Sequence, residues 1–170
     1  MKNLRNISTF AILAVAAISA AHTDAKAVKT WVQGEMNKCA KAAMMRDIKG
    51  FSMHIKENFA PSCMYKTLDG QTMTIAAWLE QVGGLFAMST KVVKAEIKAS
   101  DVKVKGNMAW ATGTFSYDAW IMKDGKKAHL QVWETAGHTL MEKDGRWWVT
   151  SAEQKKAKWL LDGKPWMPSK

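Results

Sequence analysis

The sequence predicts an α+β domain in which helices cover one face of an antiparallel sheet. Three observations predict it. Apolar residues recur at helical spacing over most of residues 24–88, polar and apolar residues alternate through residues 91–153, and two Asp-Gly pairs separate the last alternating runs. A chain of 170 residues with 48% hydrophobic residues is long enough for one domain with its own core.

A long first helix is expected from about Asp24 to Met45. Either Thr23 or Asp24 supplies a side-chain oxygen that accepts a free backbone N–H at the start of this helix. Its apolar face has three- and four-residue spacing and comprises Val28, Trp31, Val32, Met36, Cys39, Ala43 and Met44.

Two shorter helices are expected after it. Asp47 caps a second helix, which ends before Pro61 because proline disfavours helix at the preceding residue. Residues 63–66 form a short strand. Thr74 then caps a third helix, which Gly83-Gly84 weakens or stops.

Four longer strands are expected in the second half of the chain. Val93, Ala95, Ile97 and Ala99 alternate with charged residues, as in a strand with one buried face. Asp124-Gly125 and Asp144-Gly145 are strong hairpin signals, so the strands form an antiparallel meander. The other three strands are expected at residues 108–117, 128–141 and 146–152.

The N-terminus has the pattern of a secretory signal peptide, residues 1–21. Lys2 and Arg5 precede an uncharged apolar run, residues 7–18, and small residues end at Ala21. A membrane anchor is the alternative, but this run is short for a bilayer span. We therefore expect cleavage after Ala21 and export to the bacterial periplasm or medium, with no membrane span in the mature chain.

The formal net charge of +10 limits the kinds of partner that the protein could bind. The basic residues are spread along the chain, and the densest group is Lys155, Lys156 and Lys158. This spread is typical of a solvated surface rather than a polyanion site. We expect no nucleic-acid partner. The sequence has no spacing typical of a metal site and no phosphate-binding glycine loop, so no metal or cofactor is expected.

The order of these elements resembles the nuclear transport factor 2-like superfamily, in particular its exported SnoaL-like and ketosteroid-isomerase-like members. The resemblance implies a cone-shaped fold, with three N-terminal helices packed on a strongly bent antiparallel sheet around an apolar pocket. It implies a domain over residues 22–153 and leaves residues 154–170 as an irregular C-terminal tail. The matching residues are Asp47-Ile48, Asn58-Phe59-Ala60-Pro61, Gly70 with Ile75 and Trp78, residues 105–109 and residues 143–149.

The catalytic residues of the family's isomerases are not matched. Those enzymes use a tyrosine on the first helix and two acids on strands. The corresponding places here hold Cys39, then Tyr65, Lys66 and Thr67, then Ala136, Gly137 and His138. The isomerase activity is therefore not carried over.

Cys39 and Cys63 form a disulfide in one interpretation and are two separate buried thiols in the other. Two cysteines in an exported chain favour a bridge. The resemblance implies that the first helix and first strand, which carry these cysteines, meet.

The pocket implied by the resemblance has candidate lining residues. We expect Tyr65, Trp78, Phe115, Tyr117 and His138 to line it, with Tyr65, Tyr117 and His138 as its polar groups. Such a wall suits a flat apolar ligand with one hydrogen-bonding end. The alternative is that these side chains meet and close the core.

Three functions follow from these residues. The first is binding of a small apolar or amphipathic molecule, or self-association as a homodimer through the sheet, since one of the consecutive Trp147 and Trp148 must leave the core. The second is an isomerase, dehydratase or cyclase that uses His138, Glu134 or Asp118. The third is an interaction domain whose outer sheet face contacts another envelope protein.

Overall fold

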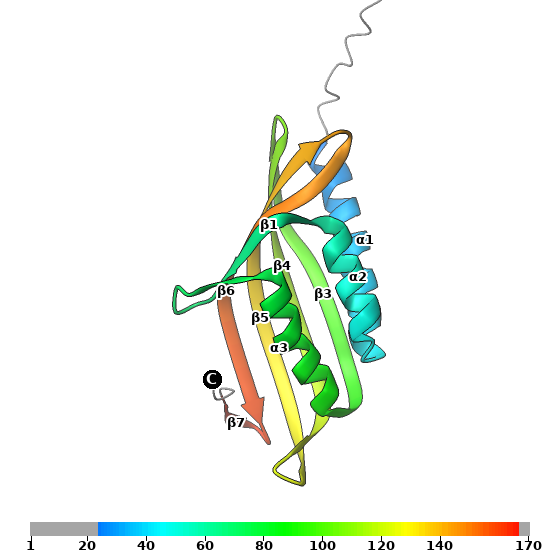
Figure 1. Cartoon of the computed structure of the whole chain (residues 1–170), viewed down its shortest axis with the longest axis vertical. Helices are drawn as coiled ribbons and strands as arrows, with labels where there is room; N and C mark the ends of the chain where they lie inside the picture. Colours follow the sequence, from blue (N-terminus) through cyan, green and yellow to red (C-terminus); the bar gives the residue numbers. More distant parts are fainter. Residues whose placement is uncertain (1–23, 167–170) are drawn as a thin grey trace, which may run out of the picture.

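The computed structural model describes residues 24–166 of the chain. The predicted signal peptide, residues 1–21, lies outside this part. Three helices lie against one face of a curved sheet, and the longest strands run roughly along the long axis of the molecule (Figure 1). Within the described residues, no helix is long and apolar enough to cross a membrane.

The three helices begin where the sequence predicts. They are α1 (Ala25–Met44), α2 (Ile48–Asn58) and α3 (Ile75–Met88). Asp24 accepts a hydrogen bond from the backbone N–H of Lys26, Asp47 from that of Gly50, and Thr74 from that of Ala77. The predicted capping residues Asp24, Asp47 and Thr74 are therefore confirmed.

The third helix continues through the two glycines that were expected to weaken or stop it. A Cβ atom on Gly83 would lie 3.3 Å from the Ile48 side chain, so glycine here permits close packing of α3 against α2. The next turn buries Leu85 and Phe86. Burial of these two side chains outweighs the modest cost of glycine in a helix.

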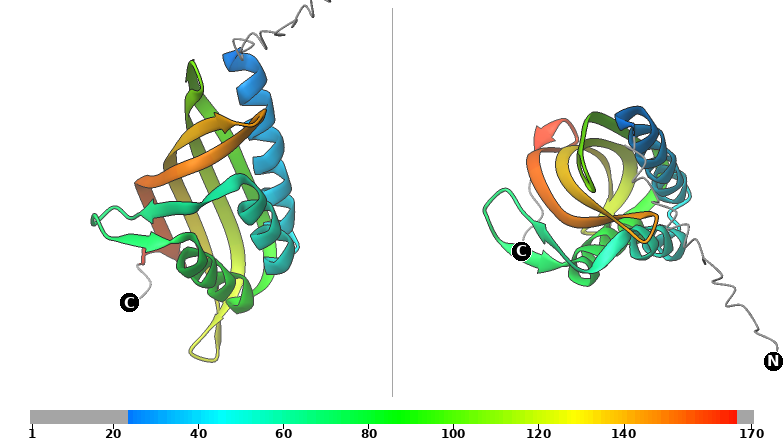
Figure 2. Two further views of the ribbon diagram at one scale, coloured as in Figure 1. Left: turned by 45° about the horizontal axis from the view of Figure 1, so that its top comes forward. Right: turned by 90° about the horizontal axis from the view of Figure 1, so that it is seen from above.

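Seven strands form one curved sheet. In order across it they run β2-β1-β6-β5-β4-β3, and the short β7 also pairs with β6. Figure 2 shows how strongly the strands bend as they pass across the helices. The strand bounds are β1 Phe59–Lys66, β2 Thr72–Thr74, β3 Ser89–Lys105, β4 Met108–Lys123, β5 Lys126–Lys143, β6 Arg146–Leu161 and β7 Lys164–Pro165.

Two hairpins join β4 to β5 and β5 to β6. Both residues of Asp124-Gly125 have positive φ, 52° and 73°, and those of Asp144-Gly145 have φ of 55° and 75°. Two consecutive positive φ angles define the turn type that matches the twist of paired strands. The antiparallel meander from β3 to β6 is thus confirmed.

The sheet differs from the expectation in the pairing of β6, which lies between β1 and β5. β1 pairs with β6 in parallel, with Tyr65 opposite Ala152, so the sheet is mixed. Residues 154–161, expected to be an irregular tail, continue β6 and pair with β5 as far as Leu161. β6 has one extra residue, Lys155, between the residues that pair with Thr135 and Ala136 of β5. This bulge breaks the alternation within β6 and hides its continuation from a period-two pattern.

The core lies between the helices and the concave face of the sheet. The largest side chains with almost no exposure include Tyr117, Ile121, Leu130 and Leu140. Trp147 is buried, whereas Trp148 stacks under the guanidinium of Arg146 at 4.3 Å on the outer face. The consecutive tryptophans therefore point to opposite faces, as strand alternation requires.

Candidate functional site

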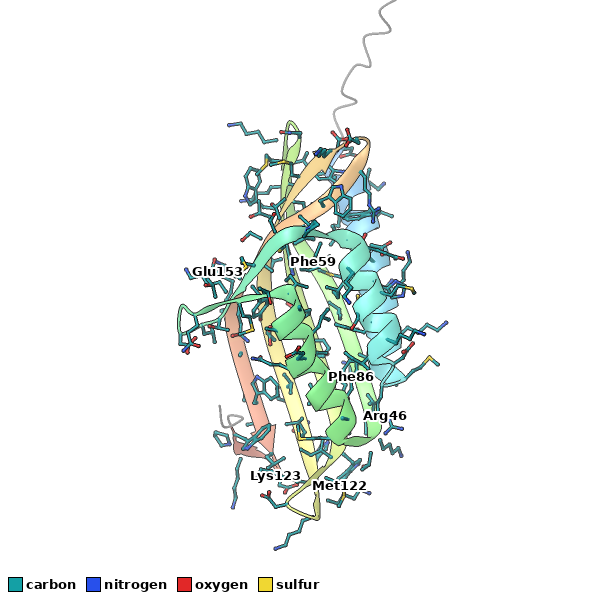
Figure 3. All side chains as sticks on the ribbon, viewed as in Figure 1. Arg46, Phe59, Phe86, Met122, Lys123 and Glu153 are labelled. Carbon is teal, nitrogen blue, oxygen red and sulfur yellow. The ribbon has the colours of Figure 1, made fainter. Side chains whose placement is uncertain are left out.

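A cavity of about 300 Å³ lies between the helices and the concave face of the sheet. Its wall is mainly apolar and aromatic, with contributions from all three helices and from β1, β3, β4, β5 and β6. Phe59 and Phe86, which are labelled in Figure 3, belong to this wall and come from β1 and α3. The space left in the core is large enough for a small organic molecule.

Four of the five predicted lining residues border this cavity. Tyr65, Trp78, Phe115 and His138 are part of its wall. Tyr65 and Trp78 come from β1 and α3, and their rings stack with 5.5 Å between centroids. Phe115 and His138 come from the inner faces of β4 and β5.

Tyr117 does not line the cavity, so the prediction that three polar groups share it is wrong. Its side chain is 1% exposed, and its hydroxyl donates to Ser89 Oγ at 2.9 Å. Its ring stacks between Phe86 and Phe115. Strand alternation does put Tyr117 on the inner face, but the end of α3 covers that part of the sheet.

Glu134 is a polar group of the cavity that the ligand prediction omitted. The Tyr65 hydroxyl donates a hydrogen bond to Glu134 Oε1 at 2.5 Å, and the Gln154 side chain is a second partner. Burial raises the pKa of Glu134, and these two hydrogen bonds partly oppose that rise. Burial and the nearby carboxylate also raise the pKa of Tyr65. The carboxylate is held between three strands, β1, β5 and β6.

His138 is an uncharged imidazole at neutral pH. Burial lowers its pKa to about 4, although the neighbouring backbone of Ala111 has the opposite effect. Its Nδ1 atom is buried and has no hydrogen-bond partner within residues 24–166. The ring packs edge-on against Phe59, with 6.3 Å between centroids. A second polar group therefore faces the aromatic wall without carrying charge.

The helices supply a third polar cluster at the cavity wall. Asn58 is buried, and its side-chain amide donates to Glu35 Oε2 at 2.9 Å and to the His54 carbonyl at 2.8 Å. Glu35 also pairs with Lys38 at 2.7 Å. The Glu35 carboxylate is therefore neutralised by a surface lysine.

Asp118, a candidate for catalysis from the sequence, is on the opposite face of the sheet. One of its oxygens is 2.7 Å from His129 Nε2, and the other accepts from Gln131 at 3.2 Å. None of these three residues lines the cavity. The even number of residues between Asp118 and Glu134 does not place them on the same face. The period-two rule applies within one strand, and these residues belong to β4 and β5.

Of the two interpretations of Cys39 and Cys63, the disulfide is wrong and the separate buried thiols are confirmed, since both cysteines are free and buried. They belong to different clusters of the core: Cys39 packs with Ala43 and Phe51, and Cys63 with Val28 and Val149. Burial raises the pKa of Cys39 to about 12 and that of Cys63 to about 11. Both are therefore thiols of low reactivity.

No three His, Cys, Asp or Glu side chains within residues 24–166 are grouped so that they could hold a metal ion. Within the cavity wall, Glu134 and His138 are separated along β5 by three residues. Hydrogen bonding and proton transfer are the chemistry that these side chains offer.

No protein-family model and no curated protein matches the sequence. Solved structures do match. A protein from Kribbella flavida has a TM-score of 0.59 at 11% identity, covering 78% of this chain and 92% of that one. A protein from Novosphingobium aromaticivorans, provisionally named a scytalone dehydratase, has 0.54 at 13% identity, covering 79% and 89%.

An NTF2-like protein from Cytophaga hutchinsonii also matches, with a TM-score of 0.47 at 10% identity over 74% of this chain and 95% of that one. The first two TM-scores, together with three helices on a bent, open sheet, show that the chain has the nuclear transport factor 2-like fold. The predicted fold is confirmed. Identities this low establish the fold alone.

Proposed function

We propose that the domain binds one small, largely apolar molecule with a single polar end inside the cavity. The observation that carries this proposal is the cavity itself: about 300 Å³ of space, an aromatic wall and a few polar side chains that converge on it. Ligand sites in proteins have this size and composition. A core that served stability alone would be expected to close such a space, since cavities lower stability.

The experiment is calorimetric titration with 2-naphthol, a flat neutral probe. We expect saturable binding of one molecule per chain. Ala136→Phe places a ring in the cavity and should weaken binding at least about tenfold, because the space is filled. Thr135→Phe is the matched control, since adjacent strand residues face opposite sides. Absence of binding to the wild-type protein would contradict the proposal.

A second function, acid–base catalysis on the bound molecule, is favoured by Glu134. Its raised pKa, its place in the cavity wall and its hydrogen bond to Tyr65 suit a general base. The reaction would move a proton to or from a carbon next to a carbonyl group, as in isomerisation or dehydration.

Exchange of the α-protons of 2-tetralone with D₂O, followed by NMR, tests this second function. Wild-type protein should accelerate the exchange, and Glu134→Gln should lower the rate by about 10² or more, because the amide cannot accept the proton. Asp118→Asn is the control, because Asp118 lies outside the cavity and should leave the rate unchanged. Equal rates for wild type and Glu134→Gln would remove the catalytic proposal.

Export and self-association are also part of the proposal. The N-terminal pattern supports cleavage after Ala21 and a place in the periplasm or medium. The outer sheet face supports a homodimer through its exposed Trp110 and Trp133. Lys94 and Lys98 of β3 also lie on that face, and both are paired there with Glu96, at 3.0 and 2.9 Å, which lowers the repulsion between lysines that a dimer would have to overcome.

A further inference from the structure

The cavity wall has a charge opposite to that of the chain as a whole. The chain has 25 Lys and Arg against 15 Asp and Glu. Among the described residues that line the cavity none is Lys or Arg, whereas Glu35 and Glu134 are acidic. The basic residues of the surface therefore do not determine the electrostatic potential inside the cavity. Carboxylates and the faces of aromatic rings determine it there.

The two carboxylates differ in their partners. Glu35 is paired with Lys38. The partners of Glu134 are the hydroxyl of Tyr65 and the side chain of Gln154, which are both neutral, and no ion pair within residues 24–166 includes it. A buried carboxylate that has no cation beside it is stabilised when a cation binds next to it.

Aromatic rings lie beside this unpaired carboxylate and in the wall of the same cavity. Tyr65 holds it directly and stacks on Trp78. Phe115 is opposite Glu134 in the β4–β5 pairing, and Trp159 of β6 borders the same cavity. The faces of aromatic rings are negative, and a cation placed over them is attracted. Carboxylate and rings thus favour the same kind of group.

We infer that the polar end of the ligand is a cation, and that the cavity takes a flat organic amine in its ammonium form. The ammonium would donate to Glu134, replacing the missing ion-pair partner, while its apolar body packs against Trp78, Phe115 and Trp159. An alcohol of the same shape offers a hydrogen bond without the charge. A carboxylate would meet the unpaired Glu134 and no basic side chain of the cavity wall. This inference rests on the proposal that the cavity binds a small molecule.

Three probes with one shape test the inference: 2-naphthylmethylamine, 2-naphthylmethanol and 2-naphthoate, titrated calorimetrically at pH 7. We expect the amine to bind at least about tenfold more tightly than the alcohol, because a charged hydrogen bond and the ring faces act on it together. The carboxylate should bind most weakly.

Glu134→Gln tests the assignment to one residue. The amide keeps the shape and removes the charge, so amine binding should fall about tenfold or more while alcohol binding changes less than about twofold. Glu80→Gln is the matched control, because Glu80 is an exposed carboxylate outside the cavity, on α3. Thermal melts of both variants should match wild type.

The possible results separate the two proposals. If none of the three probes binds, the proposed ligand-binding function fails. If the alcohol binds as tightly as the amine, the cavity binds ligands but the preference for a cation is wrong. If Glu134→Gln keeps the full preference for the amine, the assignment to Glu134 is overturned.

Discussion

Phe86→Ala is expected to lower the free energy of unfolding by about 3 kcal/mol or more, in the range of about 3–5 kcal/mol for buried aromatic truncations. Phe86 is 3% exposed and packs edge-on against Phe51, with 5.6 Å between centroids, and face-on against Tyr117 at 6.1 Å. One ring therefore joins α3 to α2 and to β4. We place the value near the lower end because part of the ring already borders the cavity.

Urea denaturation at pH 7 measures this effect. Met88→Ala, two residues further along α3, is the control, since Met88 is 39% exposed and its truncation should change stability by less than about 0.5 kcal/mol. The loss of the Phe86 ring also extends the cavity toward Tyr117, so a longer probe should bind the variant better relative to 2-naphthol. A loss of stability no larger than that of Met88→Ala would show that Phe86 is not a core residue.

The features that the sequence predicted correctly are decided by neighbouring residues. A capping oxygen at Asp24, Asp47 or Thr74 binds a backbone N–H two or three residues away. The two Asp-Gly turns need only residues that tolerate positive φ. Both features depend on residues that are close together in the chain, so a short stretch of sequence is enough to predict them.

The features that the sequence did not reveal depend on contacts between distant segments. The parallel pairing of β1 with β6 joins Tyr65 to Ala152, and no turn signal announces it. The continuation of β6 beyond residue 153 is supported by its pairing with β5, where Lys158 lies opposite Trp133. Burial against a partner strand, which is absent from local pattern, decides both.

The candidate site shows the same division. Alternation along β5 placed Glu134 and His138 on one face, and both border the cavity. The hydrogen bond that makes Glu134 distinctive comes from Tyr65, 69 residues away in the chain. Tyr117 was misplaced for a similar reason, because Phe86 near the end of α3 stacks on its ring and Ser89 binds its hydroxyl. Strand period selects a face, whereas the packing of other elements decides which part of that face stays open.

His138 should make the domain less stable in mild acid. Its pKa in the folded protein is about 4, below the ordinary value near 6.5, because burial disfavours the charged ring. The unfolded chain therefore binds this proton more readily than the folded one. The resulting loss of stability begins as the pH falls below about 6.5 and reaches about 3 kcal/mol near pH 4.

His138→Leu removes the titrating ring while keeping an apolar side chain in its place. The test is urea denaturation at pH 7 and pH 4.5, comparing how much each protein loses between the two. The variant should lose about 2–3 kcal/mol less than wild type.

The variant must be compared with wild type because Glu134, whose pKa is raised, acts in the opposite direction. The folded state binds the proton of Glu134 more readily than the unfolded state does, which favours folding in acid. His129→Gln, on the outer face, is the control and should keep the contribution of His138. If His138→Leu loses as much stability between pH 7 and pH 4.5 as wild type, the imidazole is not held uncharged in the folded protein. His138 would then be a charged group of the cavity wall rather than a neutral one.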